Sequence, residues 1–350
     1  MTDGAVVIAE PLPQFLGTAT IGGIATPDPT VAATARGQLD LTRSSLTGGF
    51  LTAGTFGGEG TVTAQDASTI DVNRLAVGVN GGVGALTLDA SSLAVRAHPT
   101  IANQGSMFVG ANDGSGAVAA TNSALSIDNV LRIAQGSTGA TPSLGRLALA
   151  DSTLSVGGFV TIGSFGTQSR GELSLVGSTA TVGNFLRLGE AANNGQLFGE
   201  AMLEVRSSLL TVGGDLFMEA FAAPGLETIF GIDGLARGLG GYGAIDAETA
   251  TLAGLVTVDF AGLGAPPGVG DWVFDLIVTG TGIFRDFDTV QFLGLADGYS
   301  VSFYGIVEQD EGAIWRVILT QADPNQVPEP AALAVLLFGL AGLALARLRA

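Results

Sequence analysis

The chain has 350 residues and a formal net charge of −18, from 32 acidic side chains against 14 basic ones, all of which are arginine. A chain this acidic repels nucleic-acid phosphates. The absence of lysine excludes Schiff-base chemistry, and the absence of cysteine excludes disulfides, thiol catalysis and thiolate metal sites. A single histidine, His98, excludes a multi-histidine metal centre, and we expect no cofactor.

The first segment, residues 1–35, is expected to be an irregular cap in front of a repeat. Residues 1–20 lack the basic start and the continuous apolar stretch of a secretory signal, because Asp3, Glu10, Pro11 and Pro13 interrupt them. Three explanations stay open: a true start upstream of Met1, a chain that is a fragment, or a protein that is not exported. We favour the first, because residues 1–35 already resemble mature, partly repeat-like sequence.

A three-part unit then recurs seven times between Gly37 and Glu219. Its first part is an apolar-x-apolar pair, starting at Leu39, Val62, Leu86, Val118, Leu147, Leu173 and Leu203. Its second part is Ser-x-apolar-x-apolar, starting at Ser68, Ser91, Ser123, Ser152, Ser178 and Ser208, with a degenerate copy from Ser44 to Gly48. Its third part is apolar-x-apolar-Gly, ending at Gly78, Gly110, Gly163 and Gly189, with looser copies ending at Ala134 and Glu219.

The alternation of apolar and polar residues places each apolar pair on one side of a short strand. Three strands per unit, with loops of varying length between them, predict a right-handed parallel β-helix over residues 36–230 with sheets on three sides. Propeller blades need about 40 residues and four antiparallel strands, so these units are too short. A calcium-binding roll needs an acid at the sixth place of G-G-x-G-x-D, which the strings from Gly81 and from Gly240 lack.

The outward positions of the predicted coils are rich in hydroxyl groups, as at Thr47, Thr87, Ser126, Ser155, Ser174, Thr181 and Thr211. On the third side, Arg132 and Arg187 take the same outward position with Thr161 between them, and Phe108 and Phe217 are exceptional aromatics. Such a surface suits a passive matrix component or an adhesin better than a tight lectin.

Residues 231–322 have longer strands and are expected to form a C-terminal β cap, because a solenoid must cover its open end. The expected core of this cap is aromatic: Trp272, Phe274, Phe284, Phe287, Phe292, Tyr299, Phe303 and Trp315. The strands around Gly241-Tyr242-Gly243 and Gly270-Asp271-Trp272, after the repeat, resemble the end of autotransporter passenger domains. That resemblance implies a β-helix architecture more than an activity.

The tail, residues 323–350, combines Val327-Pro-Glu-Pro330, a sixteen-residue uncharged run from Ala331 to Ala346, and Arg347-Leu-Arg349. As a helix the run would be about 24 Å long, a short transmembrane span. The two arginines favour a cytoplasmic C-terminus by the positive-inside rule. The prolines keep the approach to the membrane extended.

This tail resembles the PEP-CTERM sorting signal. The resemblance implies recognition of Pro328, Glu329 and Pro330 by an exosortase-type transpeptidase, transient insertion of residues 331–346 in the inner membrane, and orientation by Arg347 and Arg349. It also implies release to the cell surface or the exopolysaccharide matrix of a Gram-negative bacterium, as in a biofilm.

Several sequence features resemble parts of nucleotide-binding or catalytic sites. Gly238-Leu-Gly-Gly-Tyr-Gly243 matches G-x-G-x-x-G, but strand-like sequence follows it, so a nucleotide site is not expected. His98 precedes Pro99 in a loop-like insertion and has no triad partners near it in sequence. Carboxylate pairs suited to a polysaccharide-degrading enzyme are Asp286 with Asp288, expected to share a strand face, and Asp310 with Glu311.

The sequence therefore predicts a non-enzymatic, exported surface or matrix protein without metal or cofactor. Two alternatives stay open. One is a secreted lyase or glycosidase on the same scaffold, and the other is a simple tail-anchored membrane protein.

Overall fold

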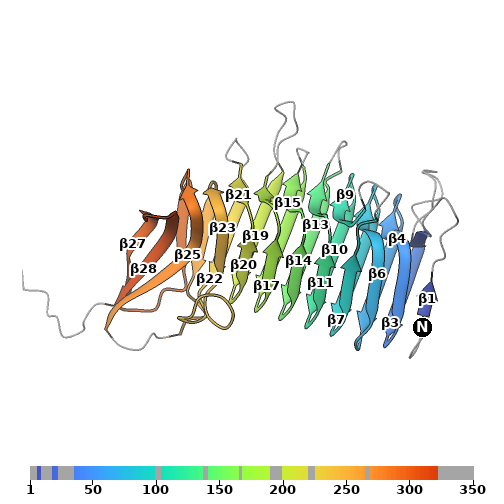
Figure 1. Ribbon diagram of the computed structural model, residues 1–350, viewed down its shortest axis with the longest axis horizontal. Coiled ribbons are helices and arrows are strands. Elements are labelled where there is room, and N and C mark those ends of the chain that lie inside the picture. Colours follow the sequence, from blue (N-terminus) through green and yellow to red (C-terminus); the bar gives the residue numbers. More distant parts are fainter. Residues whose placement is uncertain are drawn as a thin grey trace, which may run out of the picture.

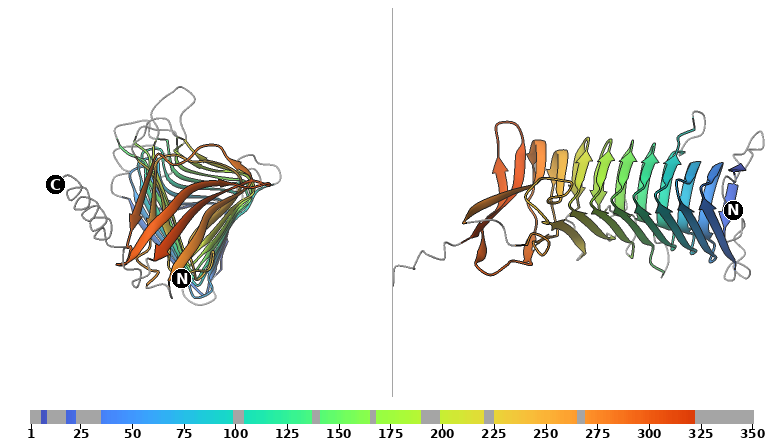
Figure 2. Two further views of the ribbon diagram at one scale, coloured as in Figure 1. Left: turned by 90° about the vertical axis from the view of Figure 1, so that its left-hand side faces the viewer. Right: turned by 90° about the horizontal axis from the view of Figure 1, so that it is seen from below.

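The computed structural model describes residues 6–8, 18–22, 35–98, 104–136, 141–164, 168–189, 199–219, 225–264 and 269–321. Every helix or strand in these ranges is a β-strand, and the strands stack mainly in parallel into an elongated solenoid (Figure 1). Seen along its length, the stacked coils share a three-sided outline (Figure 2). The predicted all-β, parallel architecture of the β-helix type is confirmed for this part of the chain.

The first face is a continuous parallel ladder in which each strand pairs with the equivalent strand of the next coil. Its members, in order, are β3 (Arg36–Thr42), β5 (Glu59–Gln65), β7 (Val83–Asp89), β10 (Ser115–Thr121), β13 (Leu144–Ala150), β16 (Arg170–Val176), β19 (Glu200–Arg206), β22 (Leu226–Gly231), β24 (Leu255–Asp259) and β26 (Thr289–Leu293).

The second and third faces belong to one sheet, which corrects the expectation of three separate sheets. Second-face strands are β1 (Val6–Ile8), β8 (Ser92–Val95), β11 (Ala124–Ile127), β14 (Thr153–Val156), β17 (Thr179–Val182) and β20 (Leu209–Val212). Third-face strands are β2 (Thr18–Ile21), β9 (Ser106–Ala111), β12 (Val130–Gln135), β15 (Phe159–Ser164), β18 (Leu186–Leu188) and β21 (Asp215–Met218). The faces merge because β4 (Ser45–Thr55), β6 (Thr69–Val79) and β23 (Ala244–Thr251) run through the corner between them.

The core consists of the stacked apolar pairs that the repeat predicts. Leu154 and Val156 of β14 are buried, for example, while Thr153 and Ser155, which alternate with them, are exposed. All of these inward residues belong to a single apolar cluster that runs the length of the solenoid. Six of the seven predicted outward hydroxyls are at least partly exposed, but Ser174 is buried and donates a hydrogen bond to Glu204 Oε2, 2.7 Å away.

The repeated serines form a ladder at the corner between the first and second faces. Its members, Ser44, Ser68, Ser91, Ser123, Ser152, Ser178 and Ser208, are all buried. The backbone N–H of Ser123 donates to Ser152 Oγ at 3.0 Å, and that of Ser152 donates to Ser178 Oγ at 3.0 Å. The hydroxyl of Ser152 donates in turn to the carbonyl of Ala150, 2.7 Å away. The serine ladder thus satisfies buried polar groups where the chain turns the corner.

At the end of the third-face strands other than β21, the chain turns through a left-handed residue, which explains the recurring glycine. Gly78 has φ of +62°, and a Cβ there would lie 1.8 Å from the carbonyl oxygen of Ser115. Ala134 takes the same place in the coil of β12 with φ of +56°, a conformation that is costly for a residue with a side chain.

Parallel pairing continues beyond residue 231, where the sequence pattern changes and the cap was expected to start. Strands β22, β24 and β26 extend the first face to Leu293. The solenoid ends at a hairpin in which β25 (Gly270–Ile283) and β27 (Tyr299–Glu308) both pair antiparallel with β28 (Ala313–Gln321) (Figure 1).

The core of this hairpin region contains fewer aromatics than expected. Trp315, Phe274 and Phe287 are buried, and Phe287 meets Trp315 edge to face at 5.3 Å between ring centroids. Phe284, however, is 72% exposed, and Phe303 is 38% exposed. Phe284 follows the last residue of β25, and Phe303 lies at a register shift of β27, so neither points into the core.

Candidate functional site

The residues of the predicted sorting signal, Pro328, Glu329, Pro330, Arg347 and Arg349, lie outside the described residues, as does the apolar run 331–346. Within the described ranges, no helix has the length and apolarity needed to cross a bilayer. The described ranges also contain no cluster of histidine and carboxylate side chains that would hold a metal ion.

The carboxylates considered for catalysis hold the loop between β25 and β26 in place. Asp286 and Asp288 do not share a strand face, because both lie in that loop. Asp286 Oδ1 accepts hydrogen bonds from the indole N–H of Trp315 and the backbone N–H of Phe287, each at 2.8 Å. Asp288 accepts from the backbone N–H of Gly254, and this bond, with the contact to Arg285, holds the pKa of Asp288 below its usual value. These contacts fit a structural role.

The remaining sequence candidates do not come together into a site. Asp310 and Glu311 are exposed in the turn between β27 and β28. His98 forms an isolated bridge at the end of its described stretch. Gly238–Gly243 lies in the loop before β23, followed by a strand, as expected from the sequence. Burial raises the pKa of Tyr242 in this loop, and its hydroxyl accepts a hydrogen bond from the backbone N–H of Asp275.

Charge on the outside of the first face is arranged in pairs between neighbouring coils. Arg146 Nε lies 3.1 Å from Glu172 Oε1, and Arg170 pairs with Glu200 on the next strand. Farther along, Arg206 contacts Asp233 at 3.0 Å and Asp259 at 2.6 Å. Burial alone would raise the pKa of Asp259, but the N–H of Ala261 and the Arg206 guanidinium outweigh it and hold that pKa below its usual value.

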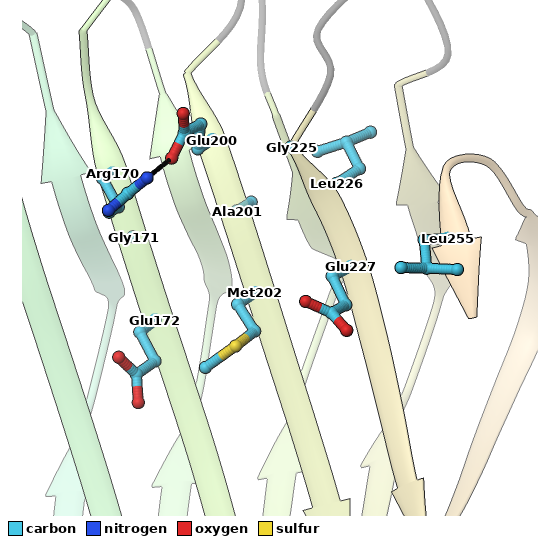
Figure 3. A pocket seen from close by; sticks show the side chains of 10 residues that line it. All are labelled: Arg170, Gly171, Glu172, Glu200, Ala201, Met202, Gly225, Leu226, Glu227 and Leu255. Atoms are coloured by element: carbon cyan, nitrogen blue, oxygen red, sulfur yellow. Dashed lines mark hydrogen bonds and ion pairs between the residues drawn. The ribbon is translucent and has the colours of Figure 1, made fainter. Parts of the chain in front are cut away.

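A shallow trough of about 490 Å³ opens on this face over β16, β19, β22 and β24 (Figure 3). Figure 3 shows the Arg170–Glu200 pair at one side, and Met202 between Glu172 and Glu227. Glu227 Oε1 accepts a hydrogen bond from Thr257 at 3.1 Å. With three glutamates and one arginine, the trough is negatively charged, and its carboxylates are bound to protein neighbours.

The outside of the third face differs from the first because it carries arginine beside aromatic rings. Arg74 of β6 is exposed, and its guanidinium carbon lies 4.7 Å from the centroid of the Phe108 ring on β9. Arg132 of β12 lies 5.6 Å from the Phe159 ring, and Arg187 lies 5.3 Å from those of Phe185 and Phe217. The predicted register of Arg132, Thr161 and Arg187 across β12, β15 and β18 is confirmed, although Thr161 is buried.

Two hollows meet at Arg74 on this face. One, of about 420 Å³, is lined by Phe50, Phe56, Thr20 and Thr52 among others, and the second, of about 280 Å³, by Ser106, Phe108, Val130 and Arg132. Arg74 lines both hollows, which together extend over β2, β4, β6, β9 and β12, and we call the two hollows taken together the Arg–Phe groove. None of the described residues that line it carries a negative charge.

Sequence reasoning singled out Phe108 and Arg132 but missed Arg74 and Phe50. Phe108 and Arg132 share one outward position, paired in register between β9 and β12. Arg74 is aligned instead with Phe50 and Ser106, two residues earlier along each strand. Each copy of the third part of the repeat has two outward positions. An alignment of both positions in every copy would have revealed Arg74 and Phe50.

Comparison with known proteins gives no family for this chain: no family model, no curated protein and no solved structure matches it.

Proposed function

We propose that this chain is a non-enzymatic, exported protein whose right-handed β-helix body acts at the cell surface or in an exopolysaccharide matrix. The observation that carries the proposal is the tail, in which Val327-Pro-Glu-Pro330 precedes the uncharged run 331–346 and the Arg347-Leu-Arg349 end. An apolar run of this length holds a substrate in the inner membrane, and the prolines before it keep the chain extended and reachable.

In this proposal an exosortase-type transpeptidase recognises Pro328, Glu329 and Pro330 and cuts near them. Arg347 and Arg349 stay on the cytoplasmic side, so the acidic body faces outward. The body supports a passive role, because several of its described arginines form ion pairs with acidic residues of neighbouring coils and its outward positions are mostly small hydroxyl residues.

The test is intact-mass analysis of the protein released by a host that carries an exosortase-type enzyme. We expect the released form to lack residues 331–350. Replacing Pro328, Glu329 and Pro330 by alanine should leave membrane insertion intact and cause the uncleaved form to accumulate. Release of a protein that still carries residues 331–350 would show that the tail is only an anchor, and the sorting proposal would be wrong.

A further inference from the structure

We propose that the Arg–Phe groove binds an acidic polysaccharide, with uronate carboxylates at Arg74 and Arg132 and sugar rings against Phe50 and Phe108. This inference rests on the proposed matrix role for the choice of ligand, and on the geometry of the third face for the site.

The charge of the groove favours an anionic ligand. The chain carries a formal net charge of −18, yet the described residues lining the groove include two arginines and no acid. The trough on the first face is lined by three glutamates and a single arginine. An anionic polymer is therefore repelled by most of the molecule and attracted at this groove.

Arg74 is placed to bind a carboxylate. Its side chain is exposed and stacks on Phe108, and no carboxylate of the described residues forms an ion pair with it. The ring holds the guanidinium beside it, and guanidinium N–H donors match the two oxygens of a carboxylate. The arginines of the first face, such as Arg146 and Arg170, already meet glutamates.

Apolar surface lies beside the positive charge of the groove. Outside the main core, Ala76, Val79 and Ala111 form a small cluster with Phe108 packed against it. Phe50 and Phe56 extend this apolar surface along the groove. The C–H faces of sugar rings bury apolar area against such rings, which a small inorganic anion does not do.

The spacing of the two arginines along the solenoid suits a linear polymer. Arg74 lies on β6 and Arg132 on β12, with β9 between them. Neighbouring strands are about 4.8 Å apart, so the two backbones are separated by about 10 Å along the axis. A linear polymer that carries regularly repeated carboxylates and lies along this axis can meet both arginines.

The test uses the full-length protein in mild detergent, with immobilised sodium alginate as the acidic probe and dextran as the neutral one. We expect binding to alginate that weakens with added salt, and no binding to dextran. Arg74→Gln should raise the dissociation constant for alginate about tenfold, because a charge-assisted hydrogen bond is lost. Arg146→Gln, an exposed arginine of the first face, is the matched control and should bind like the unaltered chain.

Equal alginate binding by Arg74→Gln and the unaltered chain would overturn the inference, and so would a lack of alginate binding by the unaltered chain. Self-association through the groove, abolished by Arg74→Gln without alginate binding, would overturn it in favour of a second copy as occupant. None of these results affects the mass of the released protein, so failure of the binding site is distinguishable from failure of the sorting proposal.

Discussion

The backbone N–H of Ser152 donates a hydrogen bond to the hydroxyl of Ser178, 26 residues later and directly adjacent in the next coil, at 3.0 Å. Both residues are buried, and the same contact joins Ser123 to Ser152 and Ser178 to Ser208. In these coils one hydroxyl accepts from the coil before it and donates within its own coil, which fixes the relative position of their corners.

Replacing a ladder serine should destabilise the protein without changing its shape. Ser152→Ala removes the acceptor for the buried N–H of Ser123, and we expect a loss of about 1–2 kcal/mol in the free energy of unfolding, measured by urea denaturation. Ser155→Ala, three residues away on the exposed side of β14, is the control and should change stability little. Equal stability of the two variants would contradict a structural role for the ladder.

The inward and outward positions of one strand should differ sharply in their tolerance of charge. Leu154→Asp places an unpaired carboxylate in the apolar core, and we expect a cost of about 4 kcal/mol or more. Ser155→Asp, on the neighbouring exposed position, should leave the unfolding midpoint nearly unchanged. Comparable losses in both variants would mean that β14 does not have this orientation.

The left-handed turns at the end of the third face should depend on glycine to different degrees. In Gly78→Ala the new Cβ would overlap the carbonyl oxygen of Ser115, so we expect a loss of more than about 2 kcal/mol. Gly81→Ala, also left-handed but in open space, should cost only the backbone term of about 1–2 kcal/mol. Ala134→Gly should leave stability unchanged or raise it by up to about 1 kcal/mol. The reverse order of stabilities would refute the steric explanation.

The contacts of Asp259 should make stability sensitive to acid. Its pKa in the folded protein lies below the usual 3.8, so the charged form stabilises the fold above that value and the contribution is lost as the pH falls through the folded pKa. We expect Asp259→Asn to be less stable than the unaltered chain near neutral pH. Unfolding midpoints measured from neutral to acid pH should show a smaller loss below pH ~4 in this variant. Parallel curves would contradict the assignment.

The sequence predicted the repeating coils well because the alternation of apolar and polar residues within each strand shows which side chains point inward. The sequence was less informative for β22 and β24, which continue the first face. No ladder serine stands between either strand and the next one, and Thr228 of β22 is a polar residue that points inward. Aromatic content likewise did not reveal that Phe284 is exposed, since exposure depends on where β25 ends.

The binding groove was harder to predict than the fold for a physical reason. Arg74 and Phe108 are 34 residues apart and lie at different outward positions, so their contact follows from the register between β6 and β9. Loop lengths set neither that register nor the contact. The pair can be recognised in the sequence only when both outward positions of every coil are aligned.

The in-register stacking of the first face also bears on how such a gene can change in length. Strands β7, β10, β13 and β16 follow one another residue for residue, although the chain between them varies. A tandem duplication of DNA encoding one whole coil would therefore yield a longer rod with the same two ends. A deletion of part of a coil would leave a strand facing the wrong neighbour, so descendants of this gene should differ in steps of whole coils.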